Sequence, residues 1–190
     1  MEDLSDEQRI RLLKLARKTI YESLGKDRFE GPNYDEFTDN IFRTKCGAFV
    51  TIHIKEALRG CIGYIEGIKA IPDTIIDLSK ASAFRDPRFP PLTLKEYENI
   101  DIEISILSPI EEVKGISDIV IGRDGLIITN RGRSGLLLPQ VATENNWDLT
   151  QFLEHTCYKA GLTPDAWKWK DTKIEKFSAQ VFGEKDMGLI

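Results

Sequence analysis

The chain has few of the residues from which disulfide frameworks and metal sites are built. Its 190 residues include only three cysteines and two histidines. The cysteines (Cys46, Cys61, Cys157) are odd in number, widely spaced and without a CxxC pair, which argues against a disulfide framework. A zinc site would require cysteines and the histidines, His53 and His155, to converge from distant segments. We therefore expect no metal site, and the sequence does not indicate a cofactor.

Long apolar runs and an excess of positive charge are also missing. No stretch approaches the roughly 20 apolar residues that a membrane-spanning helix needs. The N-terminus is acidic and then amphipathic, without the features of a signal peptide. The formal net charge is −5 at pH 7, whereas a general nucleic-acid binder gains affinity by neutralising phosphates. We therefore expect a cytoplasmic protein that does not enter membranes and is not a general nucleic-acid binder.

The residues that are present are those of an ordinary globular domain. Hydrophobic residues make up 41% and charged residues 30% of the chain, and its length suits a single domain with or without a smaller lobe. Periodicity predicts helices over 5–25, from 72 to the "DPRFPPL" segment, and over 148–161. It predicts strands over 46–54, 58–65, 100–107 and 173–182, and a hairpin over 118–130 that turns at Asp124-Gly125. The apolar stretch 135–140 follows a glycine-rich loop and leads into a short helical segment. Antiparallel strands interrupted by helices indicate an α+β fold.

The stretch "LRGCIGY" (residues 58–64) places Cys61 between two glycines in a predicted strand. Glycine weakens a strand unless the chain bulges or something approaches the backbone closely. We expect a four-residue loop over 54–57 between this strand and the preceding one. That loop pairs Ile52 with Arg59 and places Cys61 beside Val50.

Two interpretations of Cys61 remain open at this point. An arginine on the same face of the strand, Arg59, would lower the pKa of the thiol and favour the reactive thiolate, and a covered arginine needs an acidic partner or an anionic ligand. Alternatively, Cys61 is a small hydrophobic residue of the core. The expected register keeps Cys61 away from His53, although a slip of one residue would bring the two onto one face.

Several motifs together resemble the AMMECR family, over a region from about residue 45 to the end of the chain. They are "FVTI…LRGCIGYI", "DPRFPPL", "EISILSP", "GLLLPQVA" and "FLEHTCYKAGL". The resemblance implies an antiparallel sheet flanked by helices in a larger α+β lobe, with a smaller β-containing lobe packed on it, and a shared site around Arg59, Gly60 and Cys61. It implies no particular reaction. Association with Memo-like and radical-SAM proteins in operons or fusions implies an enzymatic pathway and possible partners.

Other candidate residues each have a functional and a structural interpretation. Arg88 is a clamp for an anion and Asp86 the partner of an arginine, or Asp86 makes a local bond in a proline-stiffened turn. Glu103 lies on a solvated strand face, or it is covered and pairs with Arg59. Gln140 orients a ligand or begins a helix.

The segment "NRGRSG" (residues 130–135) is a further candidate. Its backbone N–H groups, with Arg131 or Arg133, could cradle an anion, whereas a hairpin tip is the simpler interpretation. Trp167 and Trp169 are expected to pack where two lobes meet rather than to bind a base.

Two functions follow from these residues. The first is a cysteine-dependent enzyme acting on a small anionic substrate, with Cys61 as nucleophile or redox-active thiol and Glu103 or Asp86 as acid/base. The second is a non-catalytic module that binds a small anionic ligand or a partner protein in the same groove. In both, the substrate-binding residues are expected to be Arg59, Gly60, Asp86, Arg88 and Gln140.

Overall fold

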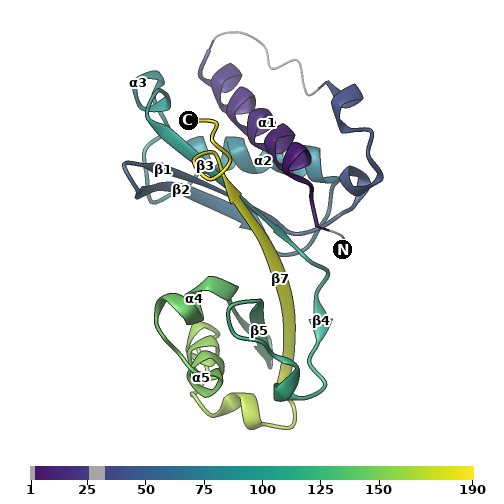
Figure 1. Cartoon of the computed structure of the whole chain (residues 1–190). Coiled ribbons are helices and arrows are strands. Elements are labelled where there is room, and N and C mark those ends of the chain that lie inside the picture. Colours follow the sequence, from purple (N-terminus) through teal and green to yellow (C-terminus); the bar gives the residue numbers. More distant parts are fainter. Residues whose placement is uncertain (1–2, 26–32) are drawn as a thin grey trace. The chain divides into compact units, whose positions relative to one another are not determined.

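The computed structural model describes residues 3–25 and 33–190 and confirms the α+β class (Figure 1). Its α-helices are α1 (Asp6–Leu24), α2 (Ile71–Phe84), α3 (Leu94–Tyr97), α4 (Pro139–Glu144) and α5 (Leu149–Lys159). Short 3₁₀ turns cover Tyr34–Phe37, Asn40–Arg43, Ile116–Asp118 and Ala166–Lys168. The strands are β1 (Ala48–Ile54), β2 (Ala57–Tyr64), β3 (Ile100–Leu107), β4 (Glu111–Glu112), β5 (Asp124–Asn130), β6 (Arg133–Leu137) and β7 (Lys173–Gly183). No helix among these residues is both long enough and apolar enough to cross a membrane.

Contacts divide the chain into two compact units. Unit 1 comprises Met1–Leu107 and Gln180–Ile190, and unit 2 comprises Ser108–Ala179. Unit 2 is therefore a continuous segment inserted between the two parts of unit 1. Strand β7 begins in unit 2 and ends in unit 1.

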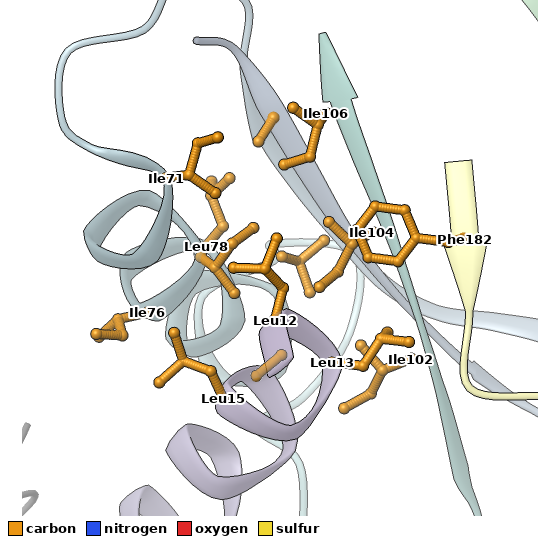
Figure 2. Close-up of a cluster of buried hydrophobic side chains, with 14 of the residues drawn as sticks. Leu12, Leu13, Leu15, Ile71, Ile76, Leu78, Ile102, Ile104, Ile106 and Phe182 are labelled. Atoms are coloured by element: carbon orange, nitrogen blue, oxygen red, sulfur yellow. The ribbon is translucent and has the colours of Figure 1, made fainter. Parts of the chain in front are cut away.

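Unit 1 is a sheet with two helices on one face. The strand order is β2-β1-β3 followed by the end of β7, and β1 pairs antiparallel with both of its neighbours. The predicted apolar face of strand 100–107 is confirmed, since all four isoleucines of β3 are buried, but Ser105 on the opposite face is buried as well. The isoleucines join side chains of α1, α2 and Phe182 in one apolar cluster (Figure 2).

Helix α1 begins as the sequence predicts. Ser5 accepts a hydrogen bond from the backbone of Gln8, and the Gln8 side chain accepts one from the backbone of Ser5, which satisfies two donors that a helix start leaves free. Gly25 ends the helix in an extended conformation with φ −78°, so its freedom to adopt positive φ is not used.

A buried ion pair joins helix α1 to the segment after β7. The Glu184 residue is 1% exposed and its carboxylate binds the Arg17 guanidinium through two hydrogen bonds. The same carboxylate accepts a hydrogen bond from the Ile102 backbone at 2.8 Å, while Arg17 donates to the Ile100 carbonyl at 2.8 Å. Because Arg17 and Glu184 each also form a hydrogen bond with the backbone of β3, the ion pair is anchored to the sheet.

Unit 2 is a smaller sheet covered by α5. Its strand order is β7-β5-β6, and β4 also pairs with β7. The core contains apolar side chains of β5 and α5, among them Leu126, Ile128, Phe152, Leu153 and Cys157.

The hairpin predicted over 118–130 is wrong. Asp124 and Gly125 begin β5, and the turn of the hairpin lies at Arg131 and Gly132, between β5 and β6. The buried Asp124 carboxylate instead accepts a hydrogen bond from the Val120 backbone at 2.9 Å. A Cβ on Gly125 would lie 2.4 Å from the ring of Phe177. This glycine therefore makes room for a ring rather than for a turn.

Candidate functional site

The hairpin that carries Cys61 turns more tightly than the sequence predicts. Lys55 and Glu56 form a two-residue turn with φ angles of 50° and 67°. Positive φ at both positions defines the primed turn whose twist matches that of a hairpin, although asparagine and glycine are its usual residues. The expected four-residue loop is therefore wrong. Because Ile52 pairs with Gly60 rather than Arg59, Arg59 is the extra residue of a β-bulge.

The bulge changes the neighbours of Cys61. Cys61 pairs with Thr51 and not, as expected, with Val50. The Thr51 hydroxyl donates a hydrogen bond to the Cys61 sulfur at 3.1 Å. On its other side, Thr51 lies opposite Glu103 of β3, so the three residues form a cross-strand row, Cys61–Thr51–Glu103. All three are half-buried, on the sheet face opposite the buried Val50.

The first glycine of the motif allows helix α2 to approach strand β2. A Cβ on Gly60 would lie 2.2 Å from the Ser82 carbonyl oxygen of α2. At this close approach the Ser82 hydroxyl accepts a hydrogen bond from the Ile62 backbone at 3.0 Å and donates one to the Val50 carbonyl at 2.7 Å. Ser82 thus bridges β1 and β2. Gly60 is required by the packing of the helix backbone.

The second glycine accommodates an aromatic ring. A Cβ on Gly63 would lie 2.1 Å from the ring of Phe49, the residue with which Gly63 pairs across the hairpin. The ring covers the glycine on the same face as the cross-strand row. Protein atoms therefore occupy the space that both glycines leave.

Asp86 binds the outer edge of β2. Its side chain is 2% exposed. It accepts four hydrogen bonds, one from the Cys61 backbone at 2.9 Å and three from the backbone and guanidinium of Arg88. The Arg88 guanidinium holds the pKa of the Asp86 carboxyl well below its usual range, aided by the two backbone N–H groups and opposed by burial. Asp86 thus makes the local turn bond and also pairs with an arginine, while the role of Arg88 toward an anion stays a prediction.

Arg88 is the cation that contacts the backbone of Cys61. Its Nη2 donates to the Cys61 carbonyl at 3.1 Å and to the Asp86 carboxylate at 2.7 Å. The Arg88 side chain remains 53% exposed, and its guanidinium lies over the ring of Phe89. Arg88 thus presents positive charge to solvent beside the strand edge.

Arg59 is paired with a carboxylate, but not with the expected one. Its Nε donates to Glu96 at 2.8 Å and its Nη2 donates to the Pro90 carbonyl at 2.9 Å. The carboxylate is Glu96 rather than the predicted Glu103, and Asp86, the other acidic candidate, binds Arg88. Arg59 is the bulged residue and its side chain reaches the segment that precedes and begins α3.

Glu96 is a residue that the sequence analysis missed. Hydrogen bonds from Arg59, and further ones from Thr93, lower its pKa from 4.5 to about 2 against the effect of burial. Thr93 and Glu96 form the capping box of α3. The Thr-x-x-Glu spacing of "TLKE" is a signal that could have located this carboxylate at a helix start.

Gln140, the remaining candidate, belongs to unit 2. It is the second residue of α4, is half-buried, and its carbonyl accepts a hydrogen bond from Thr143 at 2.8 Å. Its role toward a ligand stays a prediction. In the part of the chain that the structure describes, no three histidine, cysteine or acidic side chains gather as a metal ion would require.

The chain thus has an α+β fold whose edge strand contains LRGCIG and is bound along its outer side by the Asp-Pro-Arg turn. The chain belongs to the AMMECR1 family, whose model matches residues 13–182. A protein of Methanothermobacter thermautotrophicus is 44% identical over 188 residues, which cover 95% of this chain and 96% of that one. A protein of Methanosarcina acetivorans is 45% identical over 181 residues, covering 92% and 90%. The crystal structure of the uncharacterised protein PH0010 from Pyrococcus horikoshii is similar, with a TM-score of 0.80 and 42% identity over 92% of this chain and 90% of that one.

Proposed function

We propose that unit 1 carries a cysteine-dependent active site for a small anionic substrate, with Cys61 as the nucleophile or redox-active thiol. The observation that carries the proposal is the hydrogen bond of 3.1 Å from the Thr51 hydroxyl to the Cys61 sulfur. A proton directed at sulfur is a contact that a thiolate, the nucleophilic form, accepts better than a neutral thiol. Cys61 is also the half-buried member of the three cysteines, the other two being buried.

The proposal gives the neighbouring residues separate roles. Glu103 lies opposite Thr51, so the Thr51 hydroxyl stands between the thiol and a carboxylate that can take up or return a proton. The exposed guanidinium of Arg88 attracts the anionic group of the substrate. We assign Asp86 a positioning role rather than that of acid/base, because its carboxylate is already bound by Arg88 and by the Cys61 backbone.

A second candidate function is a non-catalytic module that binds a small anion or a partner protein at the same strand edge. The observation that favours it is that Arg59 and Asp86 are buried and hydrogen-bonded within the protein. In this case the charged residues stabilise the hairpin rather than take part in a reaction, and Gly60 serves the packing of α2 on the strand. Memo-like or radical-SAM proteins are the partners to be tested in this case.

Alkylation with a charged and a neutral reagent tests the first proposal. We expect both iodoacetate and iodoacetamide to label Cys61 before the other cysteines. The ratio of the iodoacetate rate to the iodoacetamide rate should be higher at Cys61 than for free cysteine, because Arg88 attracts the anionic reagent. Arg88→Gln should lower the iodoacetate-to-iodoacetamide rate ratio several-fold, and Arg88→Lys should preserve it. Arg85→Gln is the matched control, since Arg85 is an exposed cation of the same segment, and it should leave the ratio unchanged.

Two outcomes would decide against the enzyme. Cys61 that reacts only after denaturant is added would be a structural thiol. A ratio insensitive to Arg88 would remove the anion site. Untargeted mass spectrometry of ligands on protein purified from its host, compared with Cys61→Ser, then separates the two functions. A ligand retained equally by both proteins favours the binding module, and a ligand or covalent adduct lost from the variant favours the enzyme.

A further inference from the structure

A second candidate site lies entirely within unit 2, beside the turn between β5 and β6. A cavity of about 630 Å³ opens there. The turn supplies Arg131 and Arg133, the end of α5 supplies Tyr158, and the chain that follows supplies Gly161 and Trp169. Cavities of roughly 300–1,000 Å³ are the usual size for small-molecule sites. The proposed role of Cys61 in unit 1 does not involve this cavity.

A glycine beneath α5 brings these segments together. A Cβ on Gly135 of β6 would lie 2.2 Å from the backbone nitrogen of Ala160. Without that Cβ the end of α5 lies directly against the strand. Arg133 can then donate a hydrogen bond from Nη1 to the Gly161 carbonyl at 2.8 Å, which anchors its guanidinium at the cavity.

The second arginine occupies a strained and exposed position. Arg131 has a φ of 47°, a left-handed conformation that asparagine and glycine adopt more readily. Its side chain is 80% exposed and its Nε donates to Asp171 at 3.0 Å. Asparagine would suit this position of the turn better than arginine. Such strain is commonly found at functional sites.

Two aromatic residues at the cavity keep much of their surface in solvent. Tyr158 is 56% exposed and Trp169 is 39% exposed, whereas Trp167 packs against the core of unit 2. The segments that line the cavity are rich in basic residues. Residues 130–133 and 159–173 contain six lysines and arginines against two aspartates, in a chain whose net charge is −5.

We propose that this cavity binds a free nucleotide. Guanidinium groups bind phosphate oxygens through paired, charge-assisted hydrogen bonds, and exposed aromatic rings stack on bases. Arg131 and Arg133 hold the phosphate, and Tyr158 or Trp169 stacks on the base. The occupant is a mononucleotide rather than a nucleic acid strand, because the acidic chain as a whole repels a polyanion.

Calorimetric titration with the four nucleoside 5′-monophosphates, the corresponding nucleosides and inorganic phosphate tests the proposal. At least one monophosphate should bind about tenfold more tightly than its nucleoside or phosphate alone. Only the nucleotide has both a base to stack on an aromatic ring and a phosphate to bind the arginines. Arg131→Asn is the decisive variant because asparagine suits the turn. It should weaken nucleotide binding about tenfold while the unfolding midpoint stays the same or rises.

Variants of the ring and a remote cation complete the design. At least one of Tyr158→Leu and Trp169→Leu should weaken binding of the nucleotide more than of phosphate, and Phe at the same position should not. Lys114→Gln removes a positive charge from an exposed residue of unit 2 outside the cavity and should leave the affinity unchanged.

Three results would overturn the proposal. They are no saturable binding of any monophosphate, equal affinity in Arg131→Asn and the unaltered protein, and binding of a single-stranded oligonucleotide without binding of any monophosphate.

Discussion

The two hairpins of the molecule are built alike and differ in where their charges lie. Each has a two-residue turn with positive φ, at Lys55–Glu56 in unit 1 and at Arg131–Gly132 in unit 2. Each has a glycine that packs against the backbone of a helix, Gly60 against α2 and Gly135 against the end of α5. A Cβ added to either glycine would lie 2.2 Å from a backbone atom there. The shared construction is a strand pair on which a helix is seated at a glycine.

The charged residues separate the two hairpins. In the first, Arg59 and Asp86 are at most 9% exposed and are bound to partners within unit 1. In the second, Arg131 is 80% exposed and its partner Asp171 is 51% exposed. Buried charges of the first hairpin stabilise its own geometry, and exposed charges of the second are available to a ligand.

The largest expected effect concerns the glycines that both hairpins share. Gly60→Ala and Gly135→Ala should each reduce the free energy of unfolding by about 3 kcal/mol, because the new Cβ meets helix backbone that cannot move aside alone. Urea unfolding measures the loss. Gly115→Ala is the control, since its Cβ would find nothing nearer than 3.6 Å. Losses no larger than that of the control would show that the helix backbones do not pack directly against Gly60 and Gly135.

The next effect is a difference in stability loss when the carboxylate that serves each hairpin is neutralised. Asp86→Asn leaves the Cys61 and Arg88 donors without a carboxylate and should cost about 2 kcal/mol of unfolding free energy. Asp171→Asn removes the exposed partner of Arg131 and should change stability little. Equal losses in the two variants would contradict the distinction between buried and exposed charge.

Acid should weaken the attachment of Arg59 in the first hairpin. The pKa of Glu96 is lowered to about 2 by Arg59, below its value in the unfolded chain. Its stabilising contribution is therefore complete above pH about 4.5 and is lost as the pH falls toward 2. The difference in unfolding free energy between the protein and Glu96→Gln should shrink over that range. A difference that stays constant would argue against the Arg59–Glu96 pair.

The smallest effect on stability concerns two matched cross-strand pairs. Thr51 binds Cys61 and Thr129 binds Ser134, each at 3.1 Å across its hairpin. Cys61→Ser makes the first pair chemically like the second and should change stability by less than about 1 kcal/mol.

The same two pairs also test whether the Thr51 hydroxyl affects the reactivity of Cys61. Thr51→Val should slow alkylation of Cys61, and Thr129→Val should not. Burial raises the pKa of Cys46 to about 11 and raises that of Cys157, so both should react after Cys61. Earlier labelling of Cys46 would contradict the prediction.

Much of the fold could be predicted because its signals are local. The isoleucines of β3 alternate without interruption, and the Ser5–Gln8 pair marks the start of α1. The register of the first hairpin could not be predicted, since the bulge at Arg59 has no local signature and non-glycine residues occupy its turn. Gly125 was misread because a glycine that admits a ring looks in sequence like one that makes a turn.

The site was predictable only in part for a related reason. Asp86 and Arg88 are two residues apart, so their contact could be expected. Arg59 and Glu96 meet only because the segment after α2 returns along the edge of β2. Alternation along one strand cannot select among distant carboxylates.

The ion pair between Arg17 and Glu184 has a consequence for the order of folding. It joins residues separated by 167 positions, so unit 1 cannot be completed until residue 184 has left the ribosome. Unit 2 is continuous, and its first residue, Ser108, is hydrogen-bonded to its last residue but one, Ser178, at 2.8 and 2.9 Å. During synthesis the inserted unit can therefore assemble first, and closure of the surrounding unit is the final step.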